Sequence, residues 1–129
     1  MRTEESAENY LETVLLLSQK NGKVRSVDIA RERGFSKPTV SIALKKLVQK
    51  GYVEIGADLA VVLTQDGRRI AEKIYERHRL ITQMLVDIGV NETTAAQDAC
   101  KMEHDISEES FACLKAFYEK AKKHKKSGF

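Results

Sequence analysis

Residues 26–50 read SVDIARERGFSKPTVSIALKKLVQK, and this stretch predicts a helix-turn-helix. Ser26 is expected to cap a short helix that ends at Gly34. Ser36 is expected to cap a second helix with Pro38 in its first turn, where the missing N–H is tolerated. A short helix, a glycine-bearing turn and a second helix are the elements that place a recognition helix in the major groove. The sequence therefore predicts a DNA-binding module.

The second of these helices predicts which side chains face DNA. Its apolar stripe of Val40, Leu44, Leu47 and Val48 is expected to face the core. Hydroxyl groups near the helix start can reach bases or phosphates, and lysines can bind the backbone. Ile42 lies opposite the stripe, where it either meets a thymine methyl group or is an isolated surface side chain. The predicted DNA-binding residues are Arg25, Ser36, Lys37, Pro38, Thr39, Ser41, Ile42, Lys45 and Lys46.

The distribution of charge supports the same interpretation. The whole chain carries a formal net charge of +3. Residues 20–50, however, hold nine basic and two acidic side chains, a local charge of +7. A basic segment of this kind is typical of a surface that lies against phosphates. The lysine-rich end, residues 120–126, is either a solvated helix end or a second phosphate contact.

The segments around the helix-turn-helix predict a mainly α-helical fold. Residues 6–20 have helical periodicity, and β-prone runs at 52–55 and 60–63 flank a Gly/Asp turn, which predicts a hairpin. Further helices are expected from Thr64 to about Ile88, after Asn91 to about His104, and after Ser107. This order predicts a winged helix-turn-helix over residues 1–63 and a helical metal-binding and dimerisation domain over residues 64–129.

Length and composition exclude several classes of protein. The chain has 129 residues, without a run near the ~20 apolar residues of a membrane span. Its N-terminus lacks a signal-peptide pattern, so we expect a cytoplasmic protein with no membrane partner. Cys100 and Cys113 are the only cysteines, and in that compartment they are expected to be free or metal-bound. Cys113 is interpreted as a small packing thiol.

A second group of residues is polar although it lies on helix faces that are expected to be buried in the core. His78 lies on the apolar stripe of its helix, and Cys100-x-x-Glu103-His104 puts three ligand types on one side of the next helix. Buried ionisable groups are costly unless they are paired or bind metal. The predicted metal site comprises Asn9, Glu12, His78, Cys100, Glu103 and His104. Its oxygen, nitrogen and sulfur donors suit a five- or six-coordinate first-row divalent ion better than a tetrahedral structural zinc.

Two other interpretations remain open. A metal-independent winged-helix regulator would leave His78 and Cys100 as ordinary packed residues. A metalloenzyme would use Cys100, Glu103 and His104, but the sequence indicates no substrate pocket or activated water position. We therefore predict a protein that is not an enzyme and has no small organic substrate.

Several motifs in this order resemble a known family. They are residues 7–12 (AENYLE), 36–41 (SKPTVS), 63–67 (LTxxG), 77–80 (RHRL) and 100–104 (CxxEH). From about Ser6 to Glu119 the chain resembles the iron- and manganese-dependent repressors of the DtxR/MntR family. The resemblance implies a metal-activated homodimeric repressor that binds double-stranded operator DNA and controls metal-homeostasis genes. It also implies that the metal is held between the first helix and the two helices after the wing.

The family's ligands fall on the residues already singled out. The resemblance places a first-helix ligand, Asp or Met in known members, on Asn9. Glu12 is similar to the manganese branch, and Cys100 is similar to the iron branch. The implied cofactor is therefore Fe²⁺ or Mn²⁺, with Zn²⁺, Co²⁺ or Ni²⁺ able to bind in vitro. Thr82 and Ala96 replace the ligands of the iron branch's ancillary site, so this second site is expected to be lost.

Overall fold

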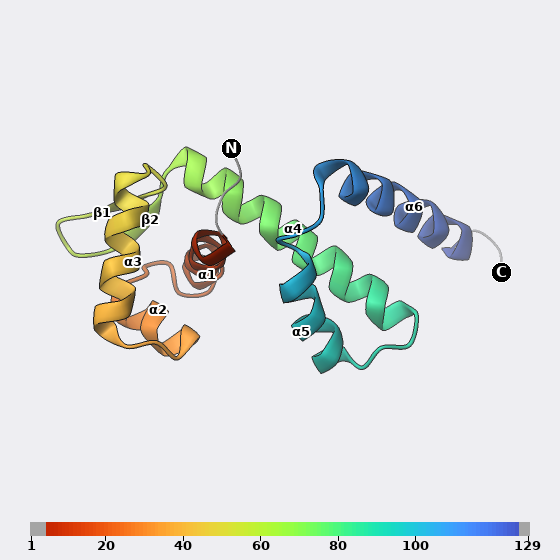
Figure 1. Cartoon of the computed structure of the whole chain (residues 1–129), viewed down its shortest axis with the longest axis horizontal. Helices are drawn as coiled ribbons and strands as arrows, with labels where there is room; N and C mark the ends of the chain where they lie inside the picture. Colours follow the sequence, from red (N-terminus) through yellow and green to blue (C-terminus); the bar gives the residue numbers. More distant parts are fainter. Residues whose placement is uncertain (1–4, 127–129) are drawn as a thin grey trace. The chain divides into compact units, whose positions relative to one another are not determined.

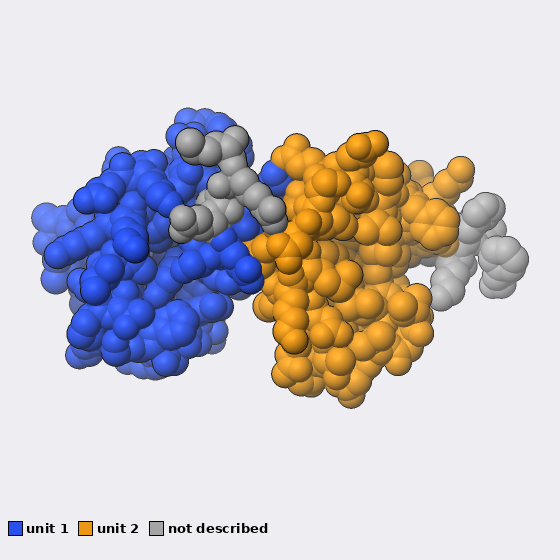
Figure 2. Space-filling model, viewed as in Figure 1, with its two compact units in different colours: residues 1–75 blue, residues 76–129 orange. Residues whose placement is uncertain are grey.

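The computed structural model describes residues 5–126 and confirms a mainly α-helical fold. The elements are α1 (Glu5–Asn21), α2 (Ser26–Arg33), α3 (Lys37–Gln49), β1 (Val53–Ile55), β2 (Val61–Leu63), α4 (Gln65–Asp87), α5 (Glu92–Met102) and α6 (Glu108–Lys126) (Figure 1). The chain forms two compact units, one up to Tyr75 and one from Glu76 (Figure 2). The division falls within α4, so this helix contributes to both units. Within the described residues, no helix is both long and apolar enough to span a bilayer.

The first unit is a helix-turn-helix closed by a two-stranded antiparallel hairpin. Helix α1 packs against α2 and β2, and α3 packs against α2 and β1. The strands pair with Val53 opposite Leu63 and Ile55 opposite Val61. Large apolar side chains from every layer, such as Leu11 and Ile29, are fully buried in this core. The unit has the element order of the predicted winged helix-turn-helix.

The turn between α2 and α3 forms as the sequence predicts. Gly34 has a φ of +69°, a left-handed conformation that glycine adopts without a steric penalty, and its N–H binds the carbonyl of Ala30. Ser36 is the N-cap of α3, and its hydroxyl accepts the N–H of Thr39 at 3.3 Å. Pro38 lies in the first turn. These contacts fix the angle at which α3 leaves α2.

Two expectations about this region are wrong. Ser26 is the first residue of α2 rather than its cap, because the Asp28 carboxylate accepts the N–H of Arg25 at 2.9 Å and makes Arg25 the N-cap. Val48 is 42% exposed rather than part of the inner stripe. It follows Leu47 by about 100° around a helix that ends at Gln49, so no further turn covers it.

The second unit contains the end of α4 with α5 and α6. Asn91 caps α5 by accepting the N–H groups of Thr93 and Thr94. Ser107 precedes α6, and its hydroxyl accepts the N–H of Ser110 at 3.0 Å. Helix α5 ends at Met102, two residues earlier than predicted. Glu103 and His104 therefore lie at the start of the turn that follows α5 rather than within the helix.

Cys113 on α6 is exposed, so its interpretation as a packing thiol is wrong. The physical reason is helical phase, since Phe111 is the buried position among the described side chains of α6. A residue two positions further along a helix points about 200° away. The lysine-rich end belongs to α6 as far as Lys126, but the side chains after Lys123 lie outside the described part of the chain.

Candidate metal centre and DNA-reading face

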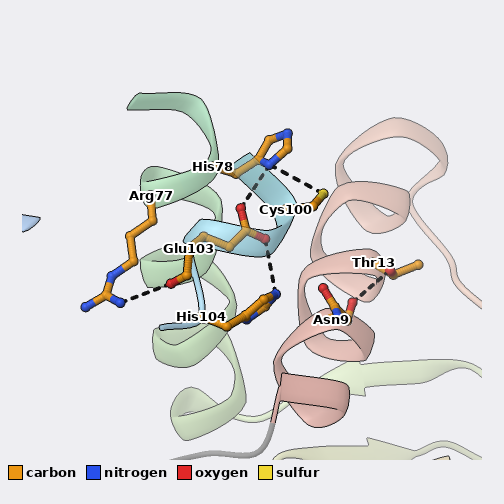
Figure 3. Close-up of polar contacts among 7 residues, drawn as sticks. All are labelled: Asn9, Thr13, Arg77, His78, Cys100, Glu103 and His104. Carbon is orange, nitrogen blue, oxygen red and sulfur yellow. Dashed lines mark hydrogen bonds and ion pairs between the residues drawn. The ribbon is translucent and has the colours of Figure 1, made fainter. Parts of the chain in front are cut away.

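Three potential metal ligands converge in the second unit. His78 on α4, Cys100 on α5 and Glu103 just after α5 place one ligand atom each within 4.8 Å of one another. The Nδ1 atom of His78 lies 2.9 Å from Oε2 of Glu103 and 3.8 Å from Sγ of Cys100 (Figure 3). All three residues belong to the predicted metal site. Helical spacing alone places Cys100 and Glu103 on one face, and the structure places His78 of α4 beside them.

The local fold explains how the ligands meet. Glu103 is the C-cap residue of α5, and its N–H still binds the carbonyl of Ala99 at 2.9 Å. Its position therefore keeps helical phase with Cys100, one turn earlier. The Glu103 side chain is fully buried and that of His78 is 25% exposed, while Cys100 is exposed. The cluster thus has a buried carboxylate and a solvent-accessible thiol.

His104 supplies a second imidazole to the same carboxylate. Its Nε2 atom lies 3.4 Å from Oε1 of Glu103, and its side chain is 1% exposed. In Figure 3 the Glu103 carboxylate lies between the two histidines, one at each oxygen. The structure therefore brings four of the six predicted ligands together.

The donor set fits a divalent transition metal. A fully buried carboxylate is costly to ionise unless a cation or several donors stabilise it. Within the described residues, the Oε1 atom of Glu103 makes no hydrogen bond. Imidazole nitrogen, thiolate sulfur and carboxylate oxygen are all ligands of first-row divalent ions. His78, Cys100, Glu103 and His104 would hold such an ion.

The other two predicted ligands lie on α1 in the first unit. Glu12 is buried, and Asn9 is half-buried. The main-chain carbonyl of Asn9 accepts a hydrogen bond from the Thr13 hydroxyl at 2.8 Å (Figure 3). Both residues belong to the first unit, and their ligation of the ion stays a prediction.

The predicted DNA-binding residues are all exposed. They are Arg25, Ser36, Lys37, Pro38, Thr39, Ser41, Ile42, Lys45 and Lys46. Ile42 is 58% exposed and lines a groove of about 250 Å³ between α1 and α3. Lys46 and Lys50 line the same groove, which also contains Tyr10. The recognition helix therefore presents an apolar side chain bordered by positive charge, while its contact with DNA stays a prediction.

Two family models match consecutive parts of the chain. Residues 2–61 match the model of the iron dependent repressor N-terminal DNA binding domain. Residues 64–128 match the model of the iron dependent repressor metal binding and dimerisation domain. The chain belongs to the iron-dependent repressor family. This confirms the resemblance drawn from the sequence.

Individual members of the iron-dependent repressor family cover most of the chain. The transcriptional regulator MntR of Escherichia coli is 35% identical over 116 residues, which are 90% of this chain and 75% of MntR. An uncharacterized HTH-type regulator of Methanocaldococcus jannaschii is 35% identical over 120 residues, 92% of this chain and 96% of that protein. A solved manganese-dependent transcriptional repressor in complex with manganese has a TM-score of 0.77 and 32% identity, over 85% of this chain. The chain spans about half of that repressor's solved chain.

In the hairpin of this repressor-family chain, the turn expected from the sequence is anchored by a contact that the sequence does not predict. Lys23, in the loop before α2, donates a hydrogen bond to Asp58 at 3.1 Å. This hydrogen bond holds the pKa of the Asp58 carboxyl below its usual value. The next residue, Leu59, has a φ of +65° and is 70% exposed. No periodic signal marks these residues, because the contact joins two loops 35 residues apart.

Proposed function

We propose that this chain is a metal-dependent transcriptional regulator that binds operator DNA as a homodimer. The observation that carries the proposal is that His78, Cys100 and His104 lie around the fully buried carboxylate of Glu103. The winged helix-turn-helix, with its exposed basic recognition helix, supplies the DNA-binding surface. Membership of the iron-dependent repressor family supports the combination.

Metal would act through the charge balance of this cluster. A bound divalent cation supplies positive charge and Lewis acidity next to the carboxylate and the thiolate. Without it, the described neighbours of the buried Glu103 carboxylate are the two imidazoles and the Cys100 thiol. Burying that charge is costly, so we expect the turn after α5 to respond to metal. Metal promotes DNA binding if it binds the DNA-competent arrangement more tightly than the alternative. Asn9 and Glu12 remain the further ligands proposed from the sequence.

Fe²⁺ and Mn²⁺ are the proposed cofactors. One solved relative is a manganese-dependent repressor in complex with manganese. In this chain, the Cys100 thiolate favours Fe²⁺ over the harder Mn²⁺, although metal availability can outweigh affinity in a cell. Zn²⁺, Co²⁺ and Ni²⁺ are expected to bind the same donors in vitro.

An apolar surface in the second unit supports self-association. A groove of about 370 Å³ between the end of α4 and α6 is lined mainly by apolar side chains. Ile88 and Phe117, which line it, are 78% and 72% exposed. Adjoining exposed apolar side chains of this size are typical of protein interfaces. A symmetric dimer would present two recognition helices about one DNA turn apart, ~34 Å.

A gel-shift titration tests the proposal. The full chain is titrated onto bacterial promoter fragments with Mn²⁺, Fe²⁺ or Zn²⁺, and again with a chelator. We expect specific retardation that increases at least tenfold with metal and is reversed by the chelator. The variant His78→Ala/His104→Ala should lose this response, and Glu109→Ala on the exposed face of α6 should keep it.

The outcomes separate the alternatives. Equal retardation with metal and with chelator would establish the metal-independent regulator instead. An unchanged response in the double histidine variant would show that the metal binds elsewhere. Failure to retard any fragment under every condition would contradict DNA binding itself.

A further inference from the structure

Arg77 is a buried cation beside the candidate metal centre that the donor set does not use. It precedes His78 on α4, and the residue is only 5% exposed. A buried guanidinium is costly unless its donors are satisfied. The contacts that compensate for the burial of Arg77 therefore have to be identified.

The contacts of Arg77 are with main-chain carbonyls and an aromatic ring. Its Nη1 atom donates to the carbonyl of Glu103 at 3.1 Å and to that of Ile106 at 2.8 Å. The guanidinium carbon lies 5.4 Å from the centre of the Phe111 ring, within the range of a cation–π interaction. One side chain of α4 thus holds the C-terminal end of α5, the following turn and the first part of α6.

These contacts fall at the point where a helix end needs a cation. The last carbonyls of a helix have no partner within the helix, and positive charge is favourable there. The neighbouring carbonyl of Met102 accepts the N–H of Asp105, at 3.2 Å. The carbonyl of Glu103 is satisfied by Arg77 (Figure 3).

Glu103 is therefore held from two adjacent residues of α4. Arg77 binds its main chain, while His78 contacts its carboxylate at 2.9 Å. Because His104 follows directly, fixing the Glu103 peptide also fixes the start of the His104 side chain. We propose that Arg77 is a positioning residue that preorganises Glu103 and His104 for metal binding.

This inference rests on the proposed function and makes a quantitative prediction. Residues that orient ligands from outside the coordination sphere change metal affinity by about 10–100-fold when they are replaced. Arg77→Met keeps the length of the side chain but removes both hydrogen bonds. Arg77→Lys keeps the charge but loses the planar group that stacks on Phe111. Arg79→Met is the matched control, because Arg79 is exposed on the same helix.

In the first measurement, the full chain is titrated with Co²⁺ alone. Binding is monitored through the thiolate-to-cobalt charge-transfer band and the d–d absorption bands. We expect Arg77→Met to raise the Kd at least tenfold and shift the d–d bands, with a smaller effect in Arg77→Lys and none in Arg79→Met. A wild-type Kd and spectrum in Arg77→Met would overturn the inference and leave the proposed function intact. If Arg77→Met does not fold, Arg77→Lys decides, and a wild-type Kd and spectrum there would overturn the inference.

A second measurement needs no metal. Amide hydrogen exchange of the metal-free chain should be about tenfold faster for residues 103–107 in Arg77→Met, and unchanged in α2 and α3. Unchanged exchange at residues 103–107 would overturn the positioning role. If the wild-type chain does not bind Co²⁺, both the proposed function and the role of Arg77 in metal binding are overturned. Faster exchange of residues 103–107 in Arg77→Met would then show only that Arg77 stabilises the turn.

Discussion

The α-carbon of Gly67 lies against the main chain of Tyr52, so that a Cβ atom at position 67 would lie 1.9 Å from the Tyr52 carbonyl oxygen. That carbonyl accepts the N–H of Thr64 at 3.0 Å. The Thr64 hydroxyl donates to the carbonyl of Gly51 at 2.6 Å and accepts the N–H of Gly67 at 3.1 Å. The first turn of α4 is thereby fastened to the segment between α3 and β1. These contacts give a physical role to the LTxxG motif.

Gly67→Ala should therefore destabilise the first unit. The added methyl group meets backbone rather than a flexible side chain, so the helix must shift. Overpacking of this kind costs about 1–3 kcal/mol, which urea unfolding followed by circular dichroism measures. Gln65→Ala, on the exposed side of the same turn, should change stability by less than about 0.5 kcal/mol. Equal midpoints for Gly67→Ala and wild type would show that the close approach does not persist in solution.

The elements of the first unit could be predicted because their signals are local. The cap at Ser36, the left-handed Gly34 and the proline in the first turn all act within four residues of one another. The two errors there have the same cause. Ser26 and Val48 lie at helix ends, where a competing carboxylate or the end of the helix outweighs residue type.

The candidate metal site was predictable in part. Cys100 and Glu103 share a helix, so their spacing alone brings them together. His78 stood out as a polar residue on an apolar stripe, but its partner could not be deduced from periodicity. The role of Arg77 could not be predicted, because an arginine is expected to be exposed unless the main-chain carbonyls that it binds are known. Contacts between helices depend on packing that one sequence does not encode locally.

Metal should stabilise the chain against unfolding by mass action. A ligand at 100 times its Kd that binds only the folded state adds about 2.7 kcal/mol. Glu103→Gln keeps the shape of the buried side chain but removes the charge, so it should lose most of this stabilisation. Thermal unfolding with Mn²⁺ and with a chelator measures both forms. Glu109→Gln, an exposed change on α6, serves as the control and should respond like wild type; an equal response in Glu103→Gln would exclude this carboxylate as a ligand.

The exposed lysines of α3 should contribute to DNA affinity without sequence preference. Each phosphate neutralised by a lysine releases counterions, which makes binding salt-dependent. Lys46→Ala should weaken binding to duplex DNA of any sequence and lower the slope of log K against log salt by about 1. Fluorescence anisotropy over a range of salt concentrations measures the slope. Lys73→Ala on α4 is the control, and a wild-type slope in Lys46→Ala would remove this residue from the phosphate contacts.

Tyr118 should titrate well above an ordinary tyrosine. Burial, and then the hydrogen bond that its hydroxyl donates to Asp87, raise its pKa to about 12. Because the folded-state pKa is higher than the unfolded value of 10.0, the protonated form favours the folded state. This contribution to stability is complete below pH 10 and is lost as the pH rises toward 12.

Asp87→Asn tests the cause of this shift. Replacing the carboxylate removes the negative charge beside the hydroxyl, so the pKa of Tyr118 should fall toward 10, although burial keeps it from reaching the ordinary value. The chain has four tyrosines, so ultraviolet titration of each protein is compared with the same protein carrying Tyr118→Phe, and the difference isolates this group. Glu119→Gln, which alters an exposed neighbouring carboxylate, should leave the curve unchanged. A Tyr118 that titrates near 10 in the wild-type chain, or at the same pH in Asp87→Asn, would mean that the α4–α6 contact through Asp87 is not formed in solution.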